Sequence, residues 1–310
     1  MRTLVTGAGG FAGSHLIELL EEGGDEIIGW LRPGTEPLVR GRRTRWTTVE
    51  LLDRNAVRTA IADLQPQAIY HLAGMPHVGD SWSHVHDTFA GNVLATHYLF
   101  DGLRQARLSP RVLVTSSATV YAPQPRAITE SDPINPNTPY GTSKLAQEML
   151  ARRAWEDDGI PAIIARSFNH VGPRQAPAFV APSIAKQIAE IEAGQSEPVM
   201  QMGNLSPERD IMDVRDTVRA YRAMLASATP GSPYNVCSGV PIRISALVDM
   251  FLARARMPIT IHRDASRVRP VDTPMILGDR ARLRADTGWT PAIPIDRTID
   301  DLLAYWRSRA

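Results

Sequence analysis

Residues 3–13 read Thr3-Leu4-Val5-Thr6-Gly7-Ala8-Gly9-Gly10-Phe11-Ala12-Gly13, and this stretch decides the fold. Its first four residues predict a short buried parallel strand, and the apolar periodicity of residues 14–22 predicts a helix. Between them, glycines let the backbone turn tightly, approach a pyrophosphate and pack the helix on the strand. The helix N-terminus adds free N–H groups and a positive dipole end for that phosphate. The stretch therefore predicts the cofactor-binding end of an α/β fold, a Rossmann-type doubly wound parallel sheet.

The chain lacks an acidic residue at the end of its second predicted strand, residues 26–30. NAD-binding folds usually place Asp or Glu there to bond the ribose 2′-hydroxyl. This chain reads Trp30-Leu31-Arg32 instead, and Arg32 can meet a 2′-phosphate. The pattern favours NADP(H). NAD(H) stays open as the alternative, because a surface arginine in such a loop needs no phosphate to explain it.

Two further strand ends are predicted to face the cofactor. Residues 46–51 predict a third strand that leads into Leu52-Asp53, where Asp53 either caps the next helix or touches adenine. Residues 68–72 predict a fourth strand that leads into Ala73-Gly74. These small residues let the backbone pass close to a cofactor.

Residues 138–144 read Thr138-Pro139-Tyr140-Gly141-Thr142-Ser143-Lys144 and begin a long predicted helix. Tyr140 and Lys144 are four residues apart, so they lie on one face of it. An ammonium beside a phenol favours the phenolate, so we expect Lys144 to lower the pKa of Tyr140. Residues 111–115 predict a fifth strand that leads to Ser117, and catalytic groups of open sheets collect at such strand ends. Ser117 is therefore predicted to bond a substrate oxygen beside Tyr140.

The whole-chain composition excludes several classes of protein. The net charge is +1, which gives no electrostatic case for binding nucleic acid or an anionic membrane. Cys237 is the only cysteine, so an intrachain disulfide framework is excluded. No apolar run approaches the ~18–20 residues of a membrane helix, and the N-terminus has no signal-peptide layout. These features predict a cytoplasmic protein.

The polar, kinked segment 75–82 suits a substrate-facing loop, and it contains His77. Together with His84 and His86, this histidine invites a metal hypothesis. However, positions 84 and 86 diverge on a helix, so they cannot bind one ion together. No metal site is predicted.

The sequence predicts two domains that share a cleft. Residues 1–169 form the cofactor-binding domain, which ends with a sixth strand at 162–166. From about residue 170, prolines punctuate shorter pieces, so 170–310 is predicted to be mostly a smaller α/β substrate domain. A strand or helix of this half can return to the main sheet. Helices are predicted near residues 180–193, 214–227, 244–256 and 295–308.

Three motifs together resemble the extended short-chain dehydrogenase/reductase superfamily: Gly7-x-x-Gly10-x-x-Gly13, Ser117 and Tyr140-x-x-x-Lys144. The resemblance implies that Tyr140 is the acid/base, that Lys144 bonds the nicotinamide ribose, and that Ser117 orients the reacting oxygen. It also implies a homodimer through the predicted helices 85–106 and 140–154. The expected cofactor contacts are Gly7, Gly10, Phe11, Ala12, Gly13, Arg32, Leu52, Asp53, Leu72, Ala73, Gly74, Tyr140 and Lys144.

The C-terminal half resembles GDP-mannose 4,6-dehydratases and, more closely, GDP-4-keto-6-deoxy-mannose reductases. The segments that carry this resemblance are 166–173, 203–210, 213–216, 234–239 and 269–272. It implies that Asn169 bonds the diphosphate or sugar and that Arg209 and Arg269 clamp the diphosphate or the nucleotide ribose. A guanidinium suits phosphate oxygens because it bonds them in pairs. The expected substrate contacts are His77, Ser117, Asn169, Val180, Arg209, Arg269 and Asp272.

One departure from the dehydratase pattern separates the activities. Dehydratases of this group carry a Glu two positions after the catalytic hydroxyl, where this chain has Thr119. A threonine cannot act as a carboxylate base, so we expect reduction of a nucleotide-linked 4-keto sugar, such as GDP-4-keto-6-deoxy-D-mannose to GDP-D-rhamnose. Three alternatives stay open: a UDP-glucose 4-epimerase, a GDP-mannose 4,6-dehydratase, and a non-catalytic NADP(H)-binding regulator. The first is included because UDP-glucose 4-epimerases also carry a segment like residues 116–121.

Overall fold

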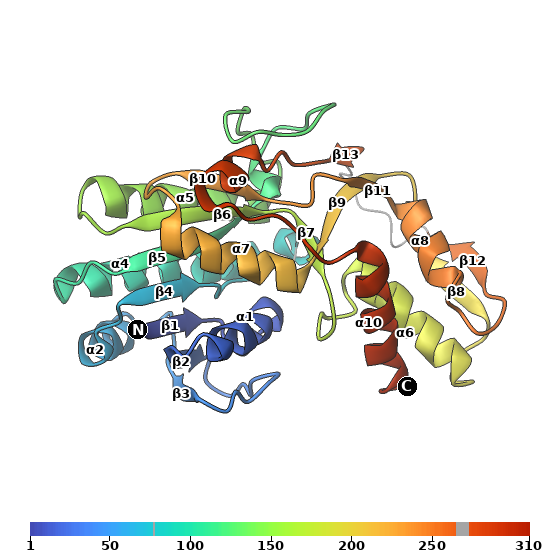
Figure 1. Cartoon of the computed structure of the whole chain (residues 1–310), viewed down its shortest axis with the longest axis horizontal. Helices are drawn as coiled ribbons and strands as arrows, with labels where there is room; N and C mark the ends of the chain where they lie inside the picture. The colour runs from blue at the N-terminus through green and yellow to red at the C-terminus, as the bar shows by residue number, and fades with distance from the viewer. Residues whose placement is uncertain (77, 265–272) are drawn as a thin grey trace.

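A seven-stranded parallel sheet and its flanking helices form the larger part of the molecule (Figure 1). The structure is a computed structural model, and it describes residues 1–76, 78–264 and 273–310. The strand order of the sheet is β10-β6-β5-β4-β1-β2-β3, and every neighbouring pair is parallel. The strand order reverses between β1 and β4, and ligands of such folds bind outside the carboxyl ends of the strands at this point. The strands are β1 (Arg2–Thr6), β2 (Glu26–Leu31), β3 (Thr44–Thr48), β4 (Ala68–His71), β5 (Arg111–Ser117), β6 (Ala162–Ser167) and β10 (Pro233–Val236).

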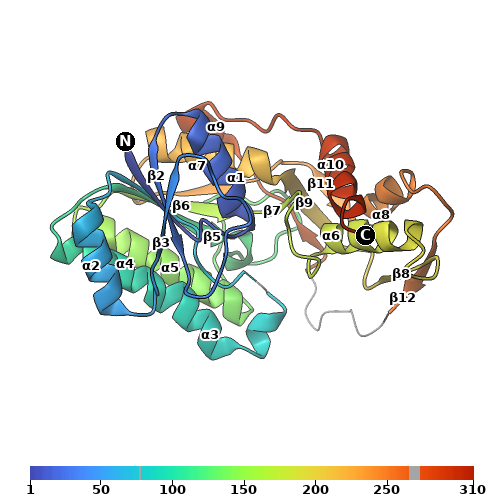
Figure 2. The same ribbon diagram turned by 90° about the horizontal axis from the view of Figure 1, so that it is seen from below.

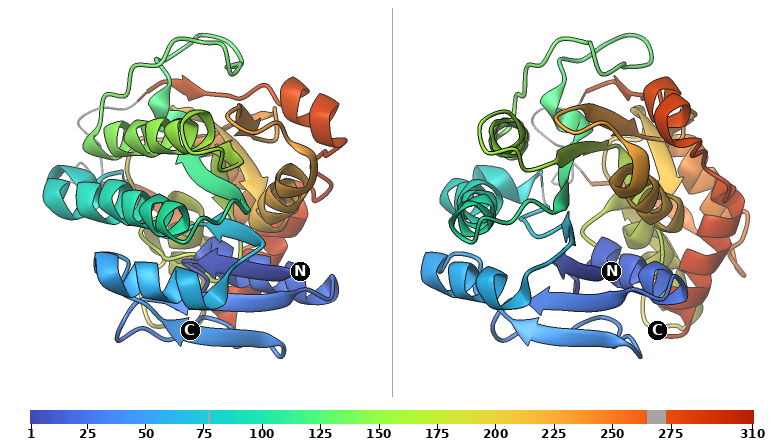
Figure 3. Two further views of the ribbon diagram at one scale, coloured as in Figure 1. Left: turned by 90° about the vertical axis from the view of Figure 1, so that its left-hand side faces the viewer. Right: turned by 60° about the vertical axis from the view of Figure 1, so that its left-hand side comes forward.

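Helices cover both faces of the sheet, as Figure 2 shows from below. One face carries α1 (Phe11–Glu22), α7 (Val214–Ser227) and α9 (Ala281–Thr287). The other face carries α2 (Arg54–Leu64), α4 (Ala95–Gln105) and α5 (Pro139–Glu156), which Figure 3 shows stacked along one side in blue to green.

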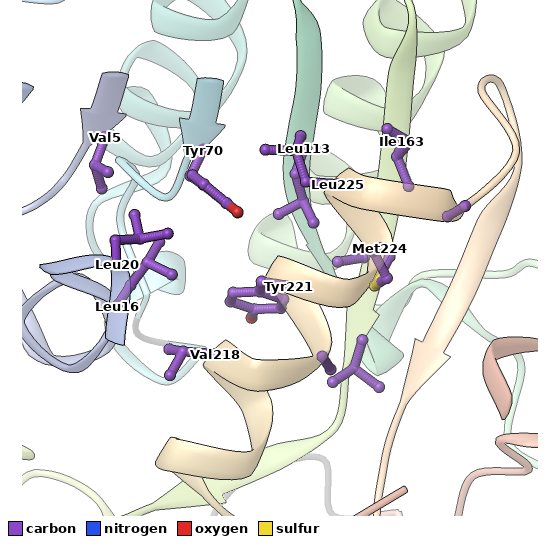
Figure 4. Close-up of a cluster of buried hydrophobic side chains, with 14 of the residues drawn as sticks. Val5, Leu16, Leu20, Tyr70, Leu113, Ile163, Val218, Tyr221, Met224 and Leu225 are labelled. Carbon is purple, nitrogen blue, oxygen red and sulfur yellow. The ribbon is translucent and has the colours of Figure 1, made fainter. Parts of the chain in front are cut away.

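Each strand contributes alternate side chains to the two apolar layers. Leu113 and Ile163 join the layer under α1 and α7, where Tyr221 and Met224 pack (Figure 4), whereas Val112 joins the layer under α2 and α4. Strands buried on both faces read as continuous apolar runs, which explains why the sequence identifies β5 and β6 so clearly.

The third strand differs from its prediction at 46–51. β3 pairs with β2 from Thr44 to Thr48 and lies at the edge of the sheet, where it alternates between half-buried and exposed side chains. The apolar residues Val49 and Leu51 follow the strand instead. They lead into α2, whose N-cap is Asp53.

The predicted helix at 85–106 is one helical path with a change of pitch. It consists of α3 (Val85–Phe89), a π-helical turn η2 (Ala90–Leu94) and α4. Asn92 lies in this turn, and its side chain bonds the backbone of Met75 and the hydroxyl of Ser143. A π turn re-aims a side chain within a helix and is frequent at functional sites.

The remaining elements form a second lobe beside the strand ends (Figure 1). Its apolar core packs α6 against α8, α10 and the strands of two small sheets. The C-terminal half of the chain also returns α7, α9 and β10 to the large sheet. The elements of the lobe are β7 (Asn169–Val171), α6 (Val180–Glu192), β8 (Val199–Met202), β9 (Glu208–Asp213), β11 (Pro241–Arg243), α8 (Ile244–Leu252), β12 (Thr260–Arg263), β13 (Met275–Ile276) and α10 (Ile295–Arg307).

Candidate active site

A large open cleft runs along the carboxyl ends of the strands and continues between the sheet and the second lobe. It brings together residues from both halves of the sequence, as expected for a ligand site at the reversal of strand order. Most of the residues predicted to contact a cofactor or substrate line it. They are Gly7, Gly10, Phe11, Ala12, Gly13, Arg32, Leu52, Leu72, Ala73, Gly74, Ser117, Tyr140, Lys144, Asn169, Val180 and Arg209.

Four predicted contacts do not line the described part of the cleft. His77, Arg269 and Asp272 lie outside the described residues. Asp53 caps α2: its Oδ1 accepts hydrogen bonds from the N–H groups of Asn55 at 2.9 Å and Ala56 at 3.0 Å. Capping, one of the two roles that the sequence offers for Asp53, therefore accounts for it.

The glycine-rich loop joins β1 to α1 in the geometry that an anion site needs. Gly7 has φ +67°, a left-handed conformation that favours glycine. A Cβ at Gly13 would overlap the backbone of Gly7 and Ala8, so only glycine allows this close packing. No side chain caps the start of α1 at Gly10, which leaves the N–H groups of its first turn directed at the cleft.

Arg32 stands just beyond the end of β2 and is exposed at the edge of the cleft. Its carbonyl accepts bonds from the N–H and hydroxyl of Thr35, which fixes the turn after the strand. Its guanidinium has no hydrogen-bond partner among the described residues. It is therefore available to bind an anion at this edge of the cleft.

Tyr140 and Lys144 lie one turn apart near the start of α5, as predicted. Thr138 caps this helix by accepting a bond from Gly141 N–H at 2.9 Å, and Pro139 occupies its first turn. Both functional side chains are buried at the bottom of the cleft. The Lys144 Nζ lies 5.8 Å from the centre of the Tyr140 ring.

Burial, rather than Lys144, controls the ionisation of Tyr140. Burial raises the pKa of Tyr140 to about 12, although a hydrogen bond with Ser117 acts in the opposite direction. The expectation that Lys144 lowers this pKa is wrong for this structure. The ammonium donates to Thr115 O at 3.0 Å and Gln147 Oε1 at 2.8 Å, not to the phenol. Tyr140 is therefore protonated at neutral pH and can serve as a proton donor.

Burial also lowers the pKa of Lys144 to about 8, while the Glu148 carboxylate opposes this shift. The ammonium form consequently predominates at neutral pH, with little margin. A buried lysine next to a cofactor site is sensitive to the hydrogen bonds that its ammonium makes, because water does not solvate it.

Ser117 ends β5 beside Tyr140, and Thr119 determines which way its hydroxyl bonds. The Ser117 Oγ accepts from Thr119 N–H at 3.2 Å and from the Thr119 hydroxyl at 3.0 Å. A hydroxyl oxygen has two acceptor sites and one proton, so both acceptor sites are occupied. The Ser117 proton is thereby directed to Tyr140 or to a ligand oxygen. The sequence identified Thr119 only as a missing acid and did not predict this contact.

A buried ion pair supports the site from below, and the sequence analysis missed it. Glu148 of α5 and Arg166 of β6 are almost fully buried and form paired hydrogen bonds of 2.6 and 2.9 Å. Ser116, next to Ser117, donates to Glu148 at 2.5 Å, and Arg166 donates to the Tyr121 hydroxyl at 2.9 Å. An arginine at the end of an otherwise apolar strand, 162–165, was the available signal.

The second lobe meets the glycine-rich loop through aromatic and charged contacts. His170 stacks on Phe11 with ring centres 5.9 Å apart. Arg174 pairs with Glu18 at 2.6 Å and also donates to His15, both on α1. These contacts hold the predicted substrate side against the predicted cofactor side.

Arg209, on β9, lines the cleft from the second lobe, and its guanidinium donates to the backbone oxygens of Glu208 and Thr273 at 2.8 Å. Asn169 and Val180 line the same part of the cleft. The described residues contain no group of three His, Cys, Asp or Glu side chains arranged to hold a metal ion. None of the helices in the described ranges is long and apolar enough to cross a membrane.

Comparison with known proteins agrees with this geometry. Residues 4–302 match the model of the GDP-mannose 4,6 dehydratase family. The chain is 31% identical over 317 residues to GDP-6-deoxy-D-mannose reductase from Pseudomonas aeruginosa, covering 99% of this chain and 98% of the relative. It is 28% identical over 315 residues to UDP-glucose 4-epimerase from Bacillus subtilis, covering 93% of this chain and 92% of the relative.

Solved structures show the same relationship. RMD from Pseudomonas aeruginosa complexed with NADPH superposes with a TM-score of 0.86 at 31% identity, covering 100% of this chain and 99% of that one. A putative epimerase from Burkholderia cenocepacia superposes with a TM-score of 0.88 at 32% identity, covering 99% and 98%. The chain therefore belongs to the GDP-mannose 4,6 dehydratase family, within the extended short-chain dehydrogenase/reductase superfamily of enzymes.

Proposed function

We propose that this enzyme uses NAD(P)H to reduce the 4-keto group of a nucleotide-linked sugar, with GDP-4-keto-6-deoxy-D-mannose as substrate and GDP-D-rhamnose as product. The observation that carries the proposal is a protonated Tyr140 beside Ser117, with a hydroxyl at Thr119 where elimination of water needs a carboxylate. The 31% identity to a GDP-6-deoxy-D-mannose reductase supports the choice of sugar.

Each group of residues in the cleft has its own proposed role in the reaction. The glycine-rich loop and the start of α1 bind the cofactor pyrophosphate, and Lys144 holds the nicotinamide ribose. A reduced nicotinamide bound there would supply the hydride for C4. Ser117 donates a hydrogen bond to the carbonyl oxygen, which polarises it, and Tyr140 delivers the proton to that oxygen.

NADPH is the proposed reductant, because Arg32 presents a guanidinium where a 2′-phosphate would lie. The relative of known structure was solved with NADPH, which supports this choice. Replacing Arg32 with Ala is expected to weaken NADPH binding by roughly tenfold and to leave NADH binding nearly unchanged, since one charge-assisted pair is lost. Titration of both cofactors against intrinsic fluorescence measures the ratio, and an unchanged ratio would mean that Arg32 makes no contact.

On the substrate side, Asn169 is assigned to the diphosphate or the sugar and Arg209 to the diphosphate or the nucleotide ribose. Val180 is a further proposed substrate contact, and all three line the second-lobe part of the cleft. His77, Arg269 and Asp272 stay predicted contacts. The proposed division at residue 169 has to allow for β10, α7 and α9, which belong to the large sheet although they follow it in sequence.

We also propose a homodimer through α3, α4 and α5. Large apolar side chains are exposed near this face at Trp82, Val85, Met149 and Trp155. Light scattering of the purified protein measures the mass, and a monomer at micromolar concentration would exclude a stable dimer.

A 4-epimerase is the second candidate function, because UDP-glucose 4-epimerases are relatives that span most of the chain. An epimerase needs the same Ser117, Tyr140 and Lys144, since it also moves a hydride at C4. It returns the hydride to the sugar, so it consumes no reduced cofactor overall. This difference separates the two candidates in one assay.

The deciding experiment incubates the enzyme with NADPH or NADH and GDP-4-keto-6-deoxy-D-mannose and follows the absorbance of the reduced nicotinamide. The proposal expects stoichiometric consumption. A Tyr140→Phe variant should lose nearly all turnover but keep cofactor binding, while Tyr305→Phe, on the distant helix α10, should behave as wild type. Interconversion of UDP-glucose and UDP-galactose without net consumption would establish the epimerase. Loss of water from GDP-mannose would establish a dehydratase, and cofactor binding without any turnover would indicate a regulator.

A further inference from the structure

The ammonium of Lys144 has a side-chain partner, Gln147, in addition to the cofactor assigned to it. Its Nζ donates to Gln147 Oε1 at 2.8 Å and to Thr115 O at 3.0 Å. An ammonium has three N–H donors, so one is left for the cleft. A Cβ built on Gly74, at the opposite wall, would lie 3.7 Å from this Nζ. Gln147 is fully buried, so water does not compete for its oxygen.

A chain of buried hydrogen bonds fixes the orientation of the Gln147 carboxamide. Gln147 Nε2 donates to Thr96 Oγ1 at 2.7 Å, and the Thr96 hydroxyl donates its single proton to Asn92 O at 2.6 Å. His71 Nε2 lies 2.9 Å from the same Thr96 oxygen. Because the Thr96 proton is already used, His71 Nε2 has to carry a proton and donate it.

The other ring nitrogen of His71 completes the chain. His71 Nδ1 is then unprotonated and accepts from the Thr6 hydroxyl at 2.8 Å, and Thr6 Oγ1 accepts from Ala73 N–H at 3.3 Å. Burial lowers the pKa of His71 to about 3, with the charge of Lys144 as a second cause, so the ring stays neutral. Every donor and acceptor along the path has one consistent role.

This consistency forbids a flip of the Gln147 amide. A flipped amide would point its NH₂ group at the Lys144 ammonium and its oxygen at a Thr96 oxygen that has no proton to give. Both contacts would be repulsive in a buried site, where unpaired polar groups are costly. The Gln147 oxygen is therefore held toward Lys144 by residues on three other elements, β1, β4 and α4.

We propose that Gln147 is a positioning residue for Lys144: its oxygen holds the ammonium in place and charged, and Thr96, His71 and Thr6 hold that oxygen. The inference rests on the proposed role of Lys144 at the nicotinamide ribose. It links α5 to the ends of β1 and β4, which are also the strands that carry the cofactor loop and Ala73. Cofactor affinity and the charge of Lys144 should thus respond to changes at Gln147, which is not placed to touch substrate.

Other charged and titratable groups near the ammonium also influence the charge of Lys144. Tyr140 and Glu148 lie on the same helix, and Glu148 is neutralised by Arg166 of β6. His71 of β4 is neutral. Gln147 is therefore the partner whose replacement changes the balance at Lys144 without disturbing an ion pair.

The test measures NADPH affinity as a function of pH, which requires no sugar turnover. Gln147→Leu removes the acceptor and keeps the size of the side chain. We expect its NADPH affinity to fall roughly tenfold or more, because a hydrogen bond to a charged group is lost. The loss of affinity on the alkaline side should begin at lower pH than in wild type. This alkaline loss of affinity is the alkaline limb of the pH profile. Gln147→Glu places a negative charge beside the ammonium and should move the alkaline limb to higher pH.

Matched threonine variants separate positioning from general destabilisation. Thr96→Val frees the Gln147 amide to flip, so it should shift the limb in the same direction as Gln147→Leu. Thr88→Val removes an equally buried hydroxyl that bonds only the His84 carbonyl within its own helix, and it should leave the pH profile unchanged. Folding of each variant is checked by thermal unfolding.

The outcomes distinguish this inference from the proposed function. If wild type binds NADPH with an alkaline limb that neither Gln147→Glu nor Thr96→Val moves, the positioning role is excluded while the reductase proposal stands. If wild type does not bind NADPH or NADH, the proposed function itself fails. Should Gln147→Leu not fold, the Gln147→Glu and Thr96→Val profiles still decide the matter.

Discussion

Replacing Arg166 with Met is expected to destabilise the protein more than most single substitutions would. The Arg166 guanidinium is inaccessible to solvent and makes two hydrogen bonds to Glu148, at 2.6 and 2.9 Å. Without it, the buried Glu148 carboxylate keeps, within the described ranges, only the Ser116 hydroxyl as a hydrogen-bond partner. Removing one member of a buried ion pair costs about 3–5 kcal/mol, because the other charge stays desolvated without compensation.

This cost translates into a measurable change in melting temperature. An unfolding entropy of about 2.1 cal/mol/K per residue, taken over the 310 residues of the chain, gives roughly 0.65 kcal/mol/K. The expected decrease in Tm for Arg166→Met is therefore about 5–8 °C. The double variant Glu148→Leu/Arg166→Met removes both charges and should regain most of the loss, because a buried pair replaced by apolar groups is often neutral in stability.

The pH dependence of unfolding gives a second signature. In Arg166→Met, Glu148 is a buried carboxyl without a counter-charge, and burial penalises the charged form of such a group. A group of this kind costs no stability below its unfolded pKa, and the cost grows as the pH rises toward the folded value. The deficit relative to wild type should therefore be small near pH 4 and should grow steadily as the pH rises to 7. A deficit below about 1 kcal/mol that does not change with pH would refute the argument.

Three further predictions concern the cofactor and the reacting groups. Gly13→Ala should lower the free energy of unfolding by about 1–3 kcal/mol and abolish cofactor binding, because its Cβ overlaps the backbone of the glycine loop. Gly23→Ala, at the other end of α1, should do neither, and calorimetry and cofactor titration check both variants. Because the pKa of Lys144 is about 8, the ammonium is present below that pH, so NADPH affinity is expected to be constant near pH 6–7 and to fall above about pH 8. Thr119→Val should lower kcat about 2–10-fold by removing one hydrogen bond to Ser117, and Thr119→Ser should restore it; equal rates for both variants would contradict the orienting role.

The fold could be predicted from local sequence signals wherever burial or turn chemistry is strong. β1, β4, β5 and β6 are apolar runs buried on both faces, and α5 has a Thr-Pro start, so these elements lie where the sequence predicted them. The return of β10 to the large sheet could be allowed for but not placed, because it depends on pairing with β6 across about seventy residues of sequence. The polar edge strand β3 gave the weakest signal, and its predicted bounds were wrong.

The candidate site, like the fold, could be predicted only in part from the sequence. The positions of Ser117, Tyr140 and Lys144 follow from strand ends and helical spacing, and the structure brings all three to one cleft. Their ionisation does not follow from spacing, because it depends on how much water is excluded. Two functional groups four residues apart suggested a direct electrostatic effect, but burial of each and the partners of Lys144 dominate instead.

The arrangement of charges around Tyr140 then has a simple physical reason. A reductase of the proposed kind needs a neutral phenol and a charged ammonium in one dry site, yet burial pushes both groups toward neutrality. The lysine keeps its charge because two oxygens and the Glu148 carboxylate face it. The tyrosine keeps its proton because burial raises its pKa and outweighs the hydrogen bond with Ser117, which acts in the opposite direction. Position 119 is half-buried in the same cleft wall. A threonine there supplies a hydrogen bond to Ser117 at no cost in charge, which suits proton donation to a carbonyl better than proton removal from carbon.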